Sequence, residues 1–286
     1  MQPFGITATA LAVTISTLAV VRSLKKKTLS KSGAISAWCV GFLTVGSGLR
    51  GFVLLMFYQI ASSATKYKKE WKEVHDATAA EASVRGPAQV LGCSALAVLL
   101  SLVHVFRVGE EKAIDYNDDY LAACLTCAIL AHHATCLADT LASELGILNK
   151  TPPVLLTQPW RTVPPGTNGG VTLWGTFMSG VGGALMGLGM AWMDWCSGIG
   201  PVQTENFFLF GTLCGLIGSF VDSILGATIQ ATYLDPETRA VHHDAQSSFK
   251  QISGVDLLTN VQVNLVSVCV TSALGGLVFG PWIFGS

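Results

Sequence analysis

Two aspartates inside apolar segments are the residues best suited to chemistry. Asp139 lies in the segment ADTLASE and Asp222 in the segment VDSILGA. Because a carboxylate at the centre of a membrane helix costs about 2.5 kcal/mol or more, such residues usually face the protein interior and serve a function. A hydroxyl residue follows each aspartate and a small residue stands four positions on, so each carboxylate borders a notch on one helix face. The alternative is a structural carboxylate near the membrane surface, neutralised by a lysine.

A glycine-rich segment, VPPGTNGG, precedes a later apolar segment. Gly166, Gly169 and Gly170 permit positive φ and close backbone approach, and Thr167 and Asn168 lie between them. The helix that follows would offer free N–H groups and the positive end of its dipole, which suits a phosphate. No lysine follows the glycines, which excludes a Walker A motif. A proline-glycine turn with Asn168 as the helix N-cap explains the segment equally well.

Basic residues gather in the polar stretch between the third and fourth apolar segments, at Lys66, Lys68, Lys69, Lys72 and Arg85. They could hold the phosphate groups of a nucleotide or of a lipid. The general excess of positive charge on the cytosolic side of a membrane protein explains the lysines equally well.

Further polar residues occupy the same end of the predicted helices. Asn260 and Asn264 stand four apart and so share a helix face, which indicates either a polar cavity or hydrogen bonding between helices. The adjacent histidines at 132–133 and 242–243 point to different faces and do not have zinc-site spacing. The pair Cys124 and Cys127 lies within an apolar run without a second pair, so it predicts no metal.

The composition shows what kind of chain positions these residues. Its 286 residues are 50% hydrophobic and 12% charged, and the mean hydropathy is +0.51. Such a chain needs lipid around it, and its net charge of -1 gives no attraction to nucleic acid. We expect an all-α polytopic membrane protein that forms a single transmembrane domain over residues 1–286, with the lipid bilayer as its surroundings.

Eight apolar segments, bounded by charge or by glycine and proline, are the predicted membrane spans. They cover about 4–21, 33–47, 51–63, 89–106, 120–148, 170–192, 207–233 and 257–284. The first is followed by lysines rather than by a small-residue cleavage site, so it predicts a retained helix and not a signal peptide.

The basic residues predict the orientation. Of the 17 lysines and arginines, only Arg50, Arg107 and Lys112 fall in the loops after the second, fourth and sixth segments. The other loops would therefore face the cytosol or an equivalent compartment such as the stroma, and both termini would face away from it. Asp139, Asp222 and the glycine-rich segment then lie toward the positively charged side.

Two pairs of segments resemble each other. The segments around Asp139 and Asp222 share the order Asp, hydroxyl residue, aliphatic residue, and SGAISAW at 32–38 parallels NGGVTLW at 168–174. These similarities predict an internal duplication, as in many membrane folds.

Seven motifs in the same order resemble one known family. They are KSGAISAWCVGF, SSATKYKK, RGPAQVL, ADTLASELG, VPPGTNGGVT, GSFVDSILGATIQ and TNVQVN, and from Ser32 to Asn264 they span essentially the whole chain, the first motif beginning at Lys31. Together they are similar to the transmembrane protein 19 family, which also contains the plant and cyanobacterial phytyl-phosphate kinase of tocopherol biosynthesis. RGPAQVL departs from the family's usual segment at that place.

The resemblance implies an integral membrane kinase that phosphorylates an isoprenoid (phytyl or related polyprenyl) monophosphate to the diphosphate, using CTP or another nucleoside triphosphate. Carboxylates that hold Mg²⁺, together with groups that bind phosphate, would suffice for such a transfer. We expect Asp139, Asp222 and Glu144 to hold Mg²⁺, and Lys66 and the two aspartates to be catalytic. The expected binding residues are Gly166, Thr167, Asn168, Gly169, Gly170, Arg85, Ser223, Gln230, Asn260 and Asn264.

An ion-coupled secondary transporter is the alternative, because paired intramembrane carboxylates in pseudo-repeated helices are also typical of carriers. A carrier needs polar residues in both halves of the membrane, and the outer half of this sequence looks apolar. A non-enzymatic scaffold would require both aspartates to be replaceable. The sequence carries no Arg/Ser-rich transit segment, and it leaves a plastid envelope and an endomembrane equally open.

Overall fold

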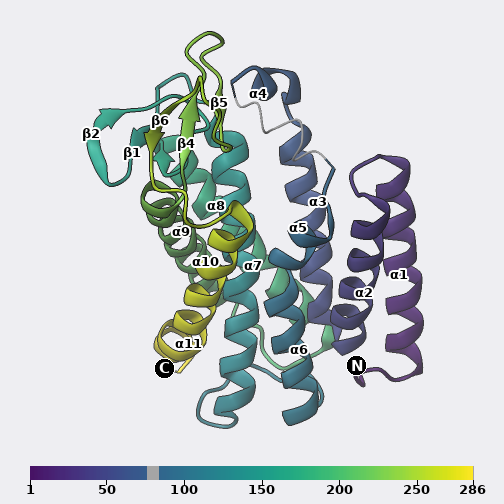
Figure 1. Cartoon of the computed structure of the whole chain (residues 1–286). Helices are drawn as coiled ribbons and strands as arrows, with labels where there is room; N and C mark the ends of the chain where they lie inside the picture. The colour runs from purple at the N-terminus through teal and green to yellow at the C-terminus, as the bar shows by residue number, and fades with distance from the viewer. Residues whose placement is uncertain (76–83, 286) are drawn as a thin grey trace.

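The apolar segments of the sequence form the helices of a bundle (Figure 1). The computed structural model describes residues 1–75 and 84–285. In chain order the helices are α1 (Ile6–Lys25), α2 (Lys31–Ser47), a short turn η1 (Leu49–Gly51), α3 (Phe52–Lys66), α4 (Lys69–His75), α5 (Pro87–Gly92), α6 (Ala95–Arg107), α7 (Tyr120–Gly146), α8 (Leu173–Ser197), α9 (Thr204–Ile229), α10 (Asn260–Leu274), the π-helical turn η3 (Gly275–Phe279) and α11 (Gly280–Phe284). The predicted segment 89–106 is divided between α5 and α6.

Four helical segments of the described residues are long and apolar enough to cross a membrane. They are α1, α7, α9 and the continuous stretch Asn260–Phe284. The helices α2, α3 and α6 are shorter, with 17, 15 and 13 residues. The chain is therefore mostly helical with four candidate spans, and the count of eight stays a prediction.

Helix α8 presents aromatic residues to its surroundings at both ends. Trp174 is 46% exposed and Trp195 70% exposed. At 1.5 Å per residue the two lie about 31 Å apart, close to the thickness of the hydrocarbon core. Tryptophan is enriched at both membrane surfaces, so α8 has the dimensions of a span although its many glycines lower its hydropathy.

The two ends of the bundle differ. Figure 1 shows the N- and C-termini at one end, and α4 with all the strands at the other. The loops that follow α3, α7 and α9 thus lie together, away from the termini, as the distribution of basic residues predicts. This arrangement brings the glycine-rich segment and the carboxyl ends of α7 and α9 to the same end.

Six short strands correct the all-α prediction. β1 (Val154–Leu155) pairs with β2 (Gln158–Thr162) and β3 (Gly170–Val171), and β4 (Thr232–Leu234) pairs with β5 (Val241–His242) and β6 (Lys250–Ser253). Each sheet has three antiparallel strands, in the orders β2-β1-β3 and β5-β4-β6. The strands escape prediction because they are short and lie in polar loops without an alternating pattern.

The core is centred on α7, which packs against α3, α6, α8, α9 and α10. Helices α8 and α9 touch through glycines, which let two helix backbones approach closely. A methyl group at Gly183 would strike the carbonyl of Gly211, and one at Gly187 would strike the carbonyl of Phe207. The backbones of α8 and α9 are therefore in direct contact.

The predicted duplication is not confirmed by the positions of the paired motifs. Trp38 lies in the middle of α2, whereas Trp174 lies in the first turn of α8. Asp139 and Asp222, in contrast, each lie two turns before the end of a long helix. The duplication stays a prediction that only the aspartate segments favour.

Candidate functional site

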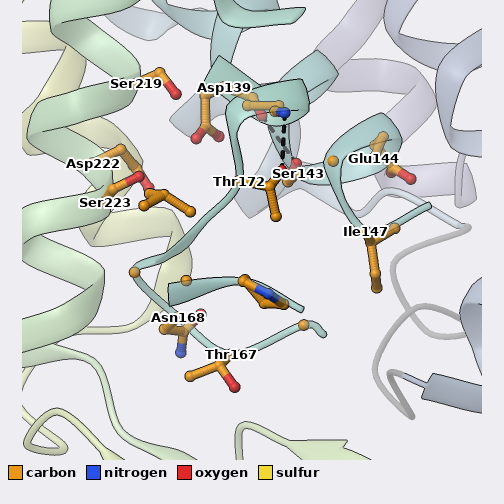
Figure 2. A pocket seen from close by; sticks show the side chains of 18 of the residues that line it. Asp139, Ser143, Glu144, Ile147, Thr167, Asn168, Thr172, Ser219, Asp222 and Ser223 are labelled. Atoms are coloured by element: carbon orange, nitrogen blue, oxygen red, sulfur yellow. Dashed lines mark hydrogen bonds between the residues drawn. The ribbon is translucent and has the colours of Figure 1, made fainter. Parts of the chain in front are cut away.

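Asp139 and Asp222 face one large cavity from two helices. Asp139 lies on α7 and Asp222 on α9, both near the end of the helix that meets the sheets, and their side chains are close enough to interact. The cavity that they line has a volume of about 710 Å³. Figure 2 shows both carboxyl groups at this cavity, with Thr167 and Asn168 across from them. The structure thus brings together the two residues that the sequence singles out.

The carboxylates lie level with the second and third turns of α8 and not with its start. Gly182 of α8 packs against Ala138, the neighbour of Asp139. Gly182 follows Trp174 by two turns, which is about 12 Å along the helix. The cavity therefore carries polar groups about two turns along α8, and the position of the aspartates in one half of the membrane stays a prediction.

Helix α10 holds the Asp222 carboxylate from the side. Ser267 Oγ donates a hydrogen bond to Asp222 Oδ2 over 2.9 Å. The side-chain amide of Asn264, oriented by its partners, donates to the same oxygen over 3.0 Å. Asn264 therefore orients a carboxylate, and the substrate contact expected of it stays a prediction.

The glycine-rich loop closes the cavity opposite the aspartates. Gly169 has a φ of +72° and lies so close to α9 that a methyl group would strike Ala227. Gly166 has a φ of +87°. The loop needs glycine at these two positions, one for the close approach and both for the backbone conformation.

Three N–H groups of the glycine-rich loop form hydrogen bonds within the protein, so they are not free to bind a phosphate as predicted. The N–H groups of Thr167, Asn168 and Gly170 already donate to Pro164 O, Thr232 Oγ1 and Thr167 O respectively, over 3.3, 3.1 and 2.9 Å. Asn168 Nδ2 donates to Ala231 O over 3.1 Å, and so ties the loop to the chain after α9. The loop shapes the cavity wall more than it offers free N–H groups.

The N-cap of α8 is Thr172, so the alternative interpretation of Asn168 as N-cap is wrong. Thr172 Oγ1 accepts a hydrogen bond from Gly175 N over 3.0 Å. Two residues of β3 stand between Asn168 and the helix start. Thr172 and Gly175 both line the cavity, so the first turn of α8 borders it directly.

The lysines that line the large cavity differ from Lys66, the lysine predicted to be catalytic. Lys66 ends α3 in an exposed position and lines neither of the two cavities described here. Lys69 and Lys72 of α4 line the large cavity instead. The sequence groups these lysines with Lys66 but does not show which of them face the cavity, because the break between α3 and α4 decides that.

Glu144 pairs with a lysine and does not join the two aspartates. Lys72, only 3% exposed, donates from Nζ to Glu144 Oε2 over 2.6 Å and to Ala64 O over 2.7 Å. No cluster of three or more His, Cys, Asp or Glu residues with metal-site geometry occurs among the described residues. The expected third carboxylate of the magnesium site is therefore not in place.

The remaining predicted residues gather where the cavity meets α9 and α10. Ser223, Gln230 and Asn260 all line it. Gln230 is buried, and its Nε2 donates to Asn260 Oδ1 over 3.4 Å. His243, which the sequence did not indicate, also lines the cavity, and its Nε2 lies 3.4 Å from Gly166 O.

A second cavity, of about 240 Å³, adjoins the first. Its walls come from α1, α2, α3, α5, α7 and α10 and are mostly apolar, while Arg85, Gln89 and Asn264 add polar groups. The guanidinium of Arg85 lies 5.8 Å from the centre of the Tyr58 ring. Both cavities are lined by Thr65, Asp139, Ser143, Glu144 and Asn260, which makes these residues the boundary between them.

A buried ion pair lies toward the opposite end of the bundle, where the sequence looked apolar. Arg50 and Asp194 are 6% and 3% exposed, and Arg50 donates from Nε and Nη2 to the two Asp194 oxygens over 2.6 and 2.8 Å. Arg50 also donates to Thr126 Oγ1 and to Lys112 O. The prediction that this region is apolar is wrong. The two charges stand 144 residues apart in the chain, so no single segment of the sequence shows the pair.

Glu111 completes this cluster. Its carboxylate accepts hydrogen bonds from Leu49 N and Arg50 N over 3.0 and 2.8 Å. Burial raises the pKa of Glu111 because it disfavours the charged carboxylate, whereas the two N–H donors favour that form. The cavity beside the cluster has a volume of only about 30 Å³.

Comparison with known proteins places the chain in a family. The integral membrane family DUF92 matches residues 14–272. Protein PGR of Arabidopsis thaliana is 36% identical over 92% of this chain and 93% of its own length. Uncharacterized membrane proteins of Synechocystis sp. and Methanocaldococcus jannaschii are 29% and 24% identical, over 74% and 89% of this chain and 76% and 87% of their own lengths. No solved structure matches. The chain therefore belongs to the DUF92 family of integral membrane proteins.

Proposed function

We propose that the chain is an integral membrane phosphotransferase that phosphorylates an isoprenoid monophosphate, phytyl or a related polyprenyl monophosphate, to the diphosphate. The phosphoryl donor is a nucleoside triphosphate, with CTP the first candidate. The narrower assignment to the transmembrane protein 19 and phytyl-phosphate kinase group, and with it a place in tocopherol biosynthesis, belongs to this proposal. It rests on the motifs from Ser32 to Asn264.

The observation that carries the proposal is the meeting of two cavities with different lining residues at Asp139. A kinase for a membrane lipid has to bring a water-soluble donor and a lipid acceptor to one point. The large cavity is bordered by the glycine-rich loop, the first turn of α8, Lys69 and Lys72, which suits a nucleotide. The smaller cavity has hydrocarbon walls and an arginine among its lining residues, which suits a phosphorylated lipid.

The chemistry requires alignment and neutralisation of charge more than covalent participation. Two adjacent carboxyl groups fit Mg²⁺, because this ion is commonly held by one or two carboxylates together with substrate phosphates and water. When bound, Mg²⁺ would neutralise the charge on the donor phosphates. Ser267 and Asn264 keep Asp222 turned toward the cavity. Lys69 and Lys72 lie along one wall, paired with Glu73 and Glu144, and Arg85 places positive charge at the lipid side.

The direct test is an assay of the purified protein in detergent with phytyl or geranylgeranyl monophosphate and each nucleoside triphosphate. We expect a lipid diphosphate with one preferred nucleotide, and loss of product when a chelator removes divalent cations. Asp139→Asn should abolish product formation without loss of folded protein. Absence of diphosphate with every donor, or full activity of Asp139→Asn, would contradict the proposal.

We further propose eight membrane crossings with the site on the positively charged side. The alternation of basic residues and the position of both termini away from the sheets support this. A cysteine introduced at Trp160, which is 83% exposed on β2, should react with an impermeant thiol reagent only from the inner face of sealed vesicles. Reaction from the outer face would reverse the orientation.

A further inference from the structure

The smaller cavity is lined by two chemically different sets of residues. Arg85, Gln89 and Asn264 line it, and Arg85 is tied to the connection between α1 and α2, where its N–H donates to Thr28 O. Leu54 and Phe57 of α3, both buried, and Val40 of α2 form its apolar walls. A space with polar groups and hydrocarbon walls matches an amphiphile with a charged head and a single apolar chain.

Small residues keep this space open on the α1 and α2 side. Ala19 on α1 and Ala37 and Gly41 on α2 line it. A methyl group at Gly41 would come within 2.7 Å of Ser16 Oγ, so the two helices approach closely there. Larger side chains at these positions would take up the space itself, because packed interiors have little room to adjust.

We infer that this cavity holds the isoprenoid tail of the lipid phosphate, and that Ala37 and Gly41 limit the length of tail that it accepts. The inference rests on the proposed function and assigns its substrate specificity. The lipid phosphate then lies between Arg85 and Asp139, where the two cavities meet. A volume of about 240 Å³ suits part of one hydrocarbon chain, which favours a single-chain isoprenoid over a two-chain phospholipid.

The test measures binding separately from catalysis. Thermal stabilisation of the purified protein is titrated with geranylgeranyl, farnesyl and geranyl monophosphate, and with inorganic phosphate and geranylgeraniol. We expect the wild type to bind geranylgeranyl monophosphate more tightly than geranyl monophosphate, inorganic phosphate or the alcohol. Ala37→Phe should weaken binding of the geranylgeranyl compound by about tenfold or more, the size expected when a side chain enters an occupied space. Its affinity for geranyl monophosphate should change much less.

A matched control and a second variant keep the test decisive. Cys39→Phe adds a similar side chain to the exposed face of α2 and should bind all three lipids as the wild type does. Leu55→Ala enlarges the cavity on the α3 side and should improve binding of a longer polyprenyl monophosphate. This variant decides the matter if Ala37→Phe does not fold.

The outcomes separate this inference from the proposed function. Equal weakening of all chain lengths by Ala37→Phe, or equal stabilisation by ordinary phospholipids, would overturn the tail site and identify the cavity as a structural lipid site. A shift in chain-length preference without diphosphate formation by the wild type would retain the tail site and reject the kinase. Diphosphate formation with unchanged chain-length preference in Ala37→Phe and Leu55→Ala would reject the tail site alone.

Discussion

The two ends of the helical bundle treat buried charge in opposite ways. Toward the end that carries the termini, Arg50 is paired with Asp194, and its guanidinium also donates to Thr126 Oγ1 and a backbone carbonyl. At the end that carries the sheets, Asp139 and Asp222 face each other across the wall of a cavity of about 710 Å³. Both regions are built on α7, which contributes Thr126 to one and Asp139 to the other.

The difference shows what separates a structural charge from a functional one. A buried ion pair whose hydrogen-bonding groups are satisfied holds helices together, and its adjoining space of about 30 Å³ leaves no room for a substrate. Two like charges beside a large cavity gain nothing from each other, and they invite a cation or a proton from outside. The first region should therefore govern stability and the second activity.

The largest expected effect is on stability. Arg50→Ala leaves Asp194 buried without a partner and should lower the free energy of unfolding by about 3–5 kcal/mol. Reversible unfolding of the purified protein in mixed detergent micelles measures this. The double variant Arg50→Met with Asp194→Leu should be less destabilised than Arg50→Ala, because neither charge is then stranded. A stability of Arg50→Ala equal to that of the wild type would remove the distinction between the two ends.

Asp222→Asn tests the other side of the comparison. The substitution keeps the shape and one acceptor for Ser267, but it removes a charge from the cavity. We expect a loss of about 10²–10³-fold in kcat, the usual size for one group that stabilises developing charge, with no loss in unfolding free energy. Rate and stability are measured on the same preparation. A variant that is strongly destabilised would make Asp222 as structural as Arg50.

Gly169→Ala tests how closely the loop defines the cavity. Its methyl group would strike Ala227 on α9, so we expect a destabilisation of about 1–3 kcal/mol and weaker nucleotide binding. Gly198 has a similar φ of +66° with no atom within 4 Å of an added methyl group. Gly198→Ala therefore isolates the backbone cost, and equal effects of the two substitutions would show that the close approach is irrelevant.

The smallest effect distinguishes two neighbouring lysines. Lys69→Met should raise the KM for the nucleotide by roughly fivefold, because a charge near a phosphate contributes about 1 kcal/mol in a solvated site. Lys66→Met should leave the KM unchanged, because Lys66 is exposed outside the cavity. Isothermal titration or steady-state kinetics with the preferred nucleotide checks both. A raised KM in Lys66→Met with an unchanged KM in Lys69→Met would restore Lys66 as the lysine of the site, as the sequence predicted.

Much of the fold follows from the sequence because runs of apolar residues bounded by charge leave few alternatives to membrane helices. Asp139 and Asp222 stand out for the same reason, since a carboxylate in such a run has a high cost. Their common cavity follows from their similar distance to the helix ends. What the sequence does not predict depends on contacts between distant residues.

Three examples show this limit. The pair Arg50 and Asp194 joins two segments of the chain that carry no shared pattern. The pairing of Glu144 with Lys72, rather than with the aspartates, depends on how α4 folds back against α7. Strand β3 occupies the two residues before Thr172, so α8 begins only after them and Thr172 is its N-cap. A strand of two residues has no alternating pattern that the sequence could show.

The glycine contact between α8 and α9 makes the site sensitive to substitutions at residues that do not line the cavity. Helix α8 contributes Thr172 and α9 contributes Asp222, so the spacing of these two helices sets the width of the cavity. That spacing is fixed by Gly183, Gly187 and Gly211, which lie further from the sheets than the residues of α8 and α9 that line the cavity. Missense alleles at these glycines should therefore lose activity as readily as alleles at the carboxylates. A survey of the activity of missense variants would show these glycines as a second cluster of loss-of-function positions, outside the cavity.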